Sequence, residues 1–426
     1  MKLNQGFDLR KVFQVEWQRT LIIVFIAQVV TAIGFSSIFP FLPLYVESLG
    51  SSTNLSIEFL AGLVYSAQAL TMMIASPFWG ALADRVGRKP MVERAMFGGA
   101  AIILIMAFVQ TAEQLVALRT LQGAITGVVA ASNALVASTT PRNRTGFAMG
   151  LLLVSMGTGV ALGPLIGGSI ADALGYSAAF FITAALLFIA GILVHFGIEE
   201  KFVPPELGEQ KSFRFFKGWR EIFSTPGVPR TYGLSFLYML GRMMVAPIAP
   251  LFIASLMEDD ALLNTFTGLV IGASAATITI SAAILGRLGD KTGHRRIVGI
   301  SAALAALMYF AQSFVNAPWQ MLVLQALVGV FLGGITPAIS ALLARYTRQG
   351  EEGAVYGLNN SIQSAGRMFA PLLGASVAAW FDLRAAFIAT AIIFVLIAIL
   401  SRYLPQPDTS HKPFPRTSEP GGAHAG

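Results

Sequence analysis

The sequence predicts an all-α integral membrane protein with twelve transmembrane helices, arranged as two related six-helix bundles. Of its 426 residues, 55% are hydrophobic and 12% are charged, whereas soluble domains carry about 25% charged residues. Long apolar runs recur along the chain, and an internal repeat divides it in two. A bilayer demands that every backbone polar group be bonded internally, and runs of about 20 residues fit helices rather than barrel strands.

Twelve apolar runs are long enough to cross a membrane. Each holds about 20 or more mainly apolar residues, the length that a helix needs to span the hydrocarbon core. The first run is too long for the core of a signal peptide, so we expect it to stay in the mature protein. The predicted helices cover 19–46, 57–81, 90–110, 115–137, 147–171, 177–197, 231–255, 264–286, 297–316, 319–343, 354–379 and 384–403.

The cations are distributed unevenly over the predicted loops. If successive loops alternate between two sides, 25 of the 29 Lys and Arg residues fall on the side of the N-terminus, and Arg384 alone falls on the other. Cytoplasmic loops of membrane proteins are enriched in Lys and Arg. The sequence therefore predicts a multi-pass membrane protein with both termini in the cytoplasm. A compact chain without cysteine favours a bacterial inner membrane.

A polar segment in the middle of the chain separates the helices six and six. Aromatic residues such as Phe215 and Trp219 are interleaved there with cations such as Lys217, a pattern that predicts an amphipathic helix on the membrane surface. The C-terminal tail is rich in Pro, Gly, Ser and Thr, which is typical of disorder. The predicted parts are an N-terminal half at 1–198, a cytoplasmic linker at 199–229, a C-terminal half at 230–404 and a disordered tail at 405–426.

The two halves repeat each other at one offset of 206 or 207 residues. The matches pair Gly34, Pro40 and Pro43 with Gly241, Pro247 and Pro250; Gly80, Asp84 and Gly87 with Gly286, Asp290 and Gly293; and Gly123, Pro164 and Phe180 with Gly329, Pro371 and Phe387. Six is an even number, so the duplicated halves insert with the same orientation. Parallel repeats of this kind are one of the known transporter plans, with the substrate held between the halves near the midplane.

Four sequence motifs stand out against this background. Their residues are Ile33, Gly34, Pro40, Phe41 and Pro43; the stretch 80–89; Leu115, Arg119, Gln122 and Gly123; and Gly159, Gly163, Pro164, Gly167, Gly168 and Ile170. With these motifs the chain resembles the major facilitator superfamily, and within it the twelve-helix drug:proton antiporter branch. The resemblance covers nearly the whole chain. It implies alternating access, and the last motif, which is associated with exporters, implies efflux rather than uptake.

The loop between the second and third helices is predicted to be a gate. Asp84 lies there beside Arg85 and Arg88, where a carboxylate can favour the positive N-terminus of a neighbouring helix. The resemblance implies that this neighbour is the eleventh helix and that the contact locks the outward-open state. The repeat places Asp290 in the same position, which predicts a second latch on the fifth helix. Alternatively, these charges only anchor a turn and set the topology.

The fifth helix carries the predicted conformational element. Gly159, Gly163 and Gly167 lie four residues apart and form a smooth stripe that allows close helix approach. Gly168 extends this small-residue region, and Pro164 can loosen the helix locally. We expect the segment to slide or bend as the halves rock. Static packing is the alternative reading.

Three arginines fall inside predicted helices, where charge is costly and raises a functional hypothesis by default. The resemblance implicates Arg119 in coupling proton movement to transport. Arg242 and Arg367 belong to none of the motifs. They face either the substrate or structural partners, such as backbone carbonyls and the amide of Gln363.

No acidic residue lies at the centre of a predicted helix. Many drug:proton antiporters of this family carry the proton on a buried carboxylate, so the chain departs from the family pattern here. The departure leaves the proton-carrying residue open. The remaining candidates, in loops or near helix ends, are Glu47, Asp84, Glu93, Glu113, Asp172 and His195.

A substrate cavity is predicted between the halves. Met and aromatic side chains adapt to varied apolar ligands, and drug pockets contain few fixed polar groups. The resemblance places such a cavity on helices one, four, seven and ten, although single residues of these types also serve in packing. The predicted cavity residues are Gln28, Phe35, Phe39, Asn133, Tyr238, Arg242, Met243, Gln325 and Arg367.

Missing motifs argue against other classes of protein. The chain has no cysteine and four scattered histidines, so we expect no metal site, no cofactor and no catalytic residues. No Walker-type, HExxH or Gly-x-Ser-x-Gly motif occurs, which argues against an ATP-driven pump or an embedded enzyme. The net charge of +7 reflects topology rather than nucleic-acid binding. The expected partners of a monomeric chain are a small-molecule substrate, protons and the lipid bilayer.

The leading prediction is an efflux carrier for amphiphilic small molecules that exchanges them for protons. A carrier specific for an anionic solute is one alternative, because three membrane arginines without matching acids favour negative charge. A non-transporting membrane sensor with the same fold is the other.

Overall fold

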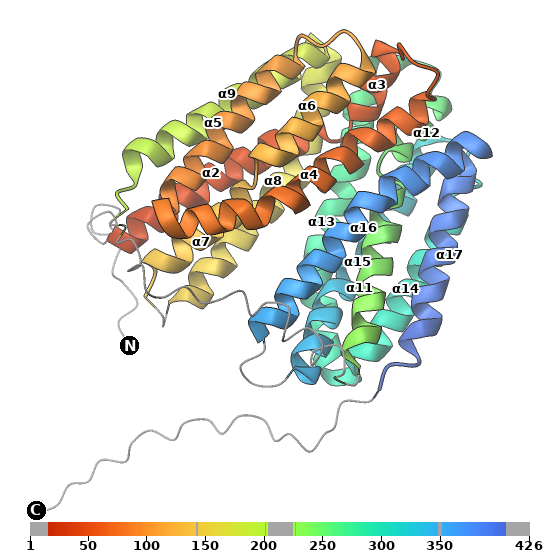
Figure 1. The fold of residues 1–426 in the computed structure, drawn as a ribbon. Helices are drawn as coiled ribbons and strands as arrows, with labels where there is room; N and C mark the ends of the chain where they lie inside the picture. Colours follow the sequence, from red (N-terminus) through yellow and green to blue (C-terminus); the bar gives the residue numbers. More distant parts are fainter. Residues whose placement is uncertain are drawn as a thin grey trace, which may run out of the picture.

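Helices form all the regular structure that a computed structural model describes, over residues 16–141, 144–200, 202, 225, 227–347 and 352–405. The first half contains α2 (Glu16–Ile38), α3 (Leu42–Leu49), α4 (Ile57–Val86), α5 (Lys89–Met106), α6 (Ala112–Ile125), α7 (Val128–Thr139), α8 (Thr145–Leu174) and α9 (Tyr176–Gly197). The second contains α11 (Val228–Met244), α12 (Ile248–Leu256), the 3₁₀ turn η1 (Asp260–Leu262), α13 (Leu263–Thr292), α14 (His294–Gln312), α15 (Pro318–Tyr346), α16 (Glu352–Trp380) and α17 (Leu383–Ser401). The two sets form two bundles (Figure 1).

Three of the twelve predicted helices are each broken into two. The predicted helix 19–46 is α2 and α3, and 231–255 is α11 and α12. Both breaks fall at the repeated prolines Pro40 and Pro247, because proline lacks the N–H that continues a helix. The predicted helix 115–137 is α6 and α7, separated at Gly127, whose φ of +132° favours glycine.

Nine stretches of the described residues are long and apolar enough to cross a membrane. They contain α2, α4, α6 with α7, α8, α9, α11 with α12, η1 with α13, α15 and α17. Helices are also present at the other three predicted positions, as α5, α14 and α16. Lys89, Glu93 and Arg94 place three charges within the 18 residues of α5, too many for an apolar span.

The halves contact each other chiefly through two helix pairs, α8 with α13 and α4 with α16. We call the end of the molecule with the loops at 86–89, 139–141 and 292–294 the basic end, and the opposite end, with α3 and α12, the distal end. A Cβ on Gly168 or Gly62, toward the distal end, would clash with backbone of the other half. A Cβ on Gly150 or Gly80, toward the basic end, would meet nothing within 4 Å. The halves therefore meet at the distal end and diverge toward the basic end (Figure 1).

Each half has its own apolar core. The core of the C-terminal half consists of one large cluster and one small one, and two clusters fill the N-terminal half. Leu44 of α3 is buried in the C-terminal cluster, so the distal contact includes apolar packing. The amphipathic helix expected within 199–229 and the tail expected at 405–426 fall mostly on 203–224 and 406–426, outside the described residues.

Candidate functional site

Arg119 lies in α6 with only 5% of its surface exposed. Its Nε donates to the Val64 carbonyl at 3.3 Å, and its Nη1 donates to Gln122 Oε1 at 2.7 Å. The neighbouring Tyr65 hydroxyl donates to the Phe39 carbonyl at 2.6 Å. Among the described residues no carboxylate pairs with Arg119. Its charge is held by backbone and amide dipoles alone, so the site can respond to an anion or a moving proton.

The break between α6 and α7 lies two turns beyond Arg119. At this break the Ala124 carbonyl loses its helical partner, and Trp79 Nε1 of α4 donates to it at 2.6 Å. The Arg94 guanidinium of α5 stacks on the Trp79 ring at 3.6 Å from its centroid. Irregular backbone at membrane depth is tolerated only where protein or a cavity satisfies it. Trp79, which sequence reasoning missed, satisfies the break in this way, and Arg94, which was also missed, packs on the Trp79 ring.

The break belongs to the N-terminal half alone. At the repeat offset of 206, Gly127 corresponds to Gly333, which lies inside the uninterrupted helix α15. Trp79 and Arg94 correspond to Leu285 and Ile300, which offer no equivalent donor. Discontinuous helices of transporters often form substrate or ion sites, so the break favours a functional site in this half.

Polar atoms without a hydrogen-bond partner are buried on both sides of the break. Buried polar groups are usually satisfied by protein, by water or by a bound group, and leaving one unsatisfied costs about 1–3 kcal/mol. Several such unsatisfied atoms lie on α2, α6 and α7, which indicates a region that can take up water or polar groups. The atoms are Gln28 Oε1, Thr31 Oγ1, Gln122 Nε2, Ser132 Oγ and Asn133 Oδ1.

The C-terminal half brings two arginines together. Arg242 of α11 and Arg367 of α16 lie close enough to repel each other, and Arg242 also interacts with the Tyr309 hydroxyl. The Tyr238 hydroxyl accepts a hydrogen bond from Thr336 Oγ1 at 3.1 Å. No described carboxylate pairs with either arginine. Two uncompensated cations favour negative charge beside them.

The other predicted cavity residues are divided between packing and polar contacts. Phe39 packs on the Tyr65 ring at 4.7 Å between centroids, and Met243 joins a small apolar cluster of α11, α16 and α17. Phe35 lies against Gly99 of α5. Gln325 accepts a hydrogen bond from Gln312 Nε2 at 2.8 Å, so a partner within its own half already engages it.

The predicted gating loop is bound by its own half in this structure. Both oxygens of Glu200 accept hydrogen bonds, from the backbone N–H groups of Arg88 at 2.9 Å and Lys89 at 2.8 Å. Glu200 thereby caps the first turn of α5. Arg85 is exposed, and the side chain of Asp84 lies outside the described part of the structure.

The second predicted latch residue, Asp290, is free of α8 here. Its side chain is 72% exposed and pairs with His294 of the following helix at 3.3 Å. Two proton-carrier candidates also lie together at the basic end, because His195 Nδ1 is 3.2 Å from Glu93 Oε1. Another candidate, Glu113, accepts hydrogen bonds from the loop at 51–53 and so has a structural use.

The glycine stripe of α8 packs inside its own half. A Cβ on Gly159, Gly163 or Gly167 would collide with α2 between Ala32 and Ser37. The next residues turn to the other half, where Gly168 contacts Asn264 and the Pro164 carbonyl contacts Gly268 of α13. Helix α8 therefore has one face fixed to α2 and another face on the interface between halves.

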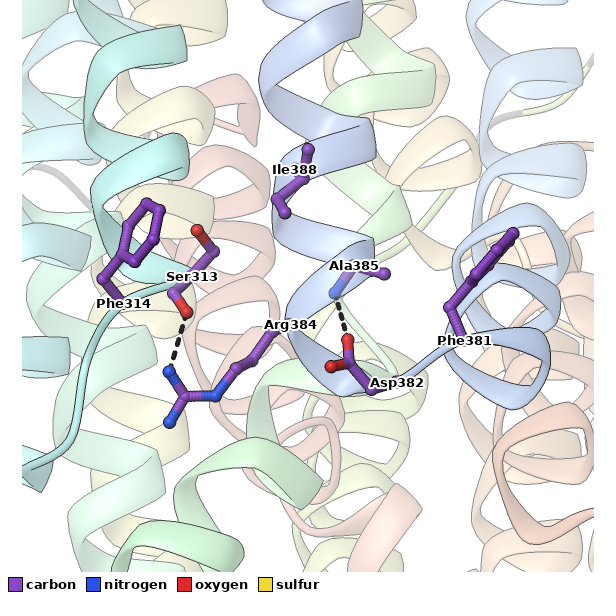
Figure 2. Close-up of a pocket in the computed structure, with 7 residues that line it drawn as sticks. All are labelled: Ser313, Phe314, Phe381, Asp382, Arg384, Ala385 and Ile388. Carbon is purple, nitrogen blue, oxygen red and sulfur yellow. Dashed lines mark hydrogen bonds between the residues drawn. The ribbon is translucent and has the colours of Figure 1, made fainter.

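A surface pocket of about 570 Å³ lies at the distal end of the C-terminal half (Figure 2). Arg384 donates to the Ser313 carbonyl at 2.8 Å beside it, and Asp382 accepts from the Ala385 N–H at 2.6 Å. None of the predicted cavity residues lines this pocket. Its residues are Ser313, Phe314, Phe381, Asp382, Arg384, Ala385 and Ile388.

Comparison with known proteins gives one consistent family. The family model of the Major Facilitator Superfamily matches residues 24–232 and 231–423. The chain is 36% identical to the multidrug resistance protein MdtG of Yersinia enterocolitica over 91% of its own length and 93% of that protein, and 34% identical to MdtG of Salmonella typhimurium over 91% and 95%.

Solved structures agree on the fold. The nucleoside transporter NupG superposes with a TM-score of 0.76 at 13% identity, covering 91% of this chain and all of that one. The human organic anion transporter TETRAN superposes with a TM-score of 0.65 at 19% identity, covering 90% and 99%. The motifs, the duplicated bundles and these matches show that the chain is a multi-pass membrane protein and belongs to the major facilitator superfamily.

Proposed function

We propose that the chain is a multidrug efflux transporter that works by alternating access and exchanges its substrates for protons. The relatives named as multidrug resistance proteins support the substrate class. The expected absence of a catalytic site and the exporter-type motif in α8 support transport rather than chemistry. The moving parts are the halves at 1–198 and 230–404, joined by the linker at 199–229, and we expect the chain to act as a monomer.

The observation that carries this proposal is the one-ended contact between the halves. They pack closely at the distal end along α8 and α13, and they separate toward the basic end. The excess of Lys and Arg supports a cytoplasmic position for the basic end. The structure is then open to the cytoplasm, the state in which an exporter of the inner membrane accepts its substrate.

Proton coupling is assigned to the N-terminal half. Arg119 has no carboxylate partner among the described residues, and the broken helix next to it leaves buried polar groups unsatisfied. A proton moving through this region would change the field at Arg119 without the need for a mid-membrane acid. Glu93 and His195 lie at the basic end, where a proton would leave toward the cytoplasm.

Everted membrane vesicles test the proposal directly. Vesicles that carry the protein would be given a fluorescent lipophilic cation and energised, and uptake would be recorded before and after collapse of the proton gradient. Gradient-dependent uptake that R119A abolishes and R119K partly restores is the expected result. Uptake unaffected by collapse of the gradient would contradict proton exchange, and no uptake would contradict export of cationic drugs.

Export of anionic solutes is the second candidate, favoured by the pair of Arg242 and Arg367. In the same vesicles a fluorescent organic anion would be compared with the cation. If the pair selects for negative charge, R242Q and R367Q reduce uptake of the anion and leave uptake of the cation intact. Equal loss of both would assign the arginines a structural role.

A further inference from the structure

Asp172, the third residue from the end of α8, reaches across to the other half of the protein. Its Oδ1 accepts hydrogen bonds from Asn264 N at 3.1 Å and from Asn264 Nδ2 at 2.8 Å. Its Oδ2 accepts from Thr265 N at 2.7 Å. Both oxygens of one carboxylate in the N-terminal half are therefore used by the first turn of α13 in the C-terminal half.

The partner is well suited to a negative charge. The first N–H groups of a helix have no partner within it, and the helix dipole makes this end positive. The hydrogen bonds that a charged carboxylate accepts from N–H groups are also stronger than those that a neutral acceptor receives. Gly168, one turn earlier on α8, lets the backbones of the two helices touch at Asn264 and so brings the carboxylate within reach.

This contact has no counterpart at the repeated position. Asp172 corresponds at the offset of 207 to Ala379 near the end of α16, which has no carboxylate to offer to α4. At the basic end the same pair of helices carries Asp290 on α13, the residue expected to latch onto α8. In this structure Asp290 is exposed, and its ionic partner among the described residues is His294.

We propose that Asp172 is the latch that holds the distal gate closed, and that the pair α8 and α13 is latched at one end at a time. Asp172 engages the N-terminus of α13 in the state described here, and Asp290 engages the N-terminus of α8 in the opposite state. This inference rests on the proposed alternating access, and it names the residue that stabilises one of the two states.

The absence of cysteine allows a direct test on the full chain. Two spin-label pairs report on the two ends: L174C with L262C as the distal pair, and F147C with L288C as the basic pair, all at exposed leucine or phenylalanine positions. Distances would be measured by double electron–electron resonance in lipid nanodiscs without substrate. D172N keeps the shape of the side chain but replaces one acceptor oxygen with a donor.

We expect D172N to raise the ratio of distal-open to distal-closed molecules by roughly tenfold, since charge-assisted bonds across the interface are lost. The basic pair should shorten in the same molecules. D172E, which keeps the charge, should lie between D172N and the unsubstituted chain. D382N is the matched control, because Asp382 caps its own helix at Ala385 and should leave both distances unchanged.

Distance distributions of D172N that match those of D382N would overturn the latch. If D172N does not fold, N264A removes one of the three bonds and should give a smaller shift in the same direction, and no shift would equally overturn it. The measurement uses no transport assay. A chain that shows the latch but exports no drug would therefore refute the proposed substrate class without touching this inference.

Discussion

Substituting Gly168 with alanine should open the distal gate, whereas the same change at its neighbour Gly167 should not. A Cβ on Gly168 would lie 2.6 Å from the carbonyl carbon of Asn264 in the other half, about 0.8 Å short of the 3.4 Å of ordinary contact. Backbone atoms cannot rotate away, so the halves must separate. Overpacking of this kind costs about 1–3 kcal/mol. The cost destabilises the distal-closed state alone, so the ratio of distal-open to distal-closed molecules should rise roughly 5- to 150-fold.

Gly167 supplies the contrast, because its Cβ would lie 2.6 Å from Ser37 Cα within the same half. G167A should therefore lower the thermal stability in both states and leave the distal-pair distance unchanged. G157A is the neutral control, since its nearest neighbour, Thr279 Cγ2, would be 3.7 Å away. The helix-propensity gain of about 1 kcal/mol for Gly to Ala is common to all three variants. Identical distance distributions for G168A and G167A would show that the clash at Gly168 does not separate the halves.

Three further predictions concern other parts of the structure. W79F keeps the ring under its arginine but loses the indole donor, so purified protein should unfold with about 1–3 kcal/mol less stability, seen as a lower midpoint in a thermal scan. The pKa of Glu47 is raised by partial burial and then by nearby carboxylates, Asp260 of the other half among them. The contribution of Asp260 depends on contact between the halves, so protonation of Glu47 favours closure. This contribution to closure is present at low pH and lost as pH rises through the raised pKa, so the distal pair should open over that window, and E47Q should abolish the response. E200Q should lower the thermal stability by about 1 kcal/mol through loss of the cap on α5, whereas E199Q, at an exposed neighbour, should not.

The arrangement of helices was predictable because it follows from solvent and repetition. A bilayer requires long apolar helices, and the sequence offset identifies the duplication without reference to structure. The breaks at Pro40 and Pro247 also have a local cause that can be read from the chain. The break at Gly127 does not, because one glycine among 42 gives no signal by itself. The break is supported by Trp79, which reaches it only once α4 packs beside α6.

Only some contacts of the candidate site could be expected from the sequence, for a similar reason. Costly charges such as Arg119 and Arg242 stand out in an apolar run, so they could be chosen as candidates from the sequence, whereas their partners come from distant segments. Asp172 was expected only as one of several proton-carrier candidates. Its contact with Asn264 joins residues 92 positions apart, and no local pattern encodes such a pairing.

The two halves have kept one fold while their polar residues have diverged, and the divergence suggests a division of roles. At the repeat offset Arg119 corresponds to Gln325, which is neutral and already bonded to Gln312. The N-terminal half alone has a broken fourth helix and the carboxylate of Asp172. The C-terminal half instead holds the pair of Arg242 and Arg367. A proton pathway needs polar groups that can rearrange, and a substrate site needs a fixed field. Separate halves can meet both needs only if their relative movement links them. If the proposed proton exchange holds, mutations at the α8 and α13 interface should uncouple proton movement from transport without altering either site.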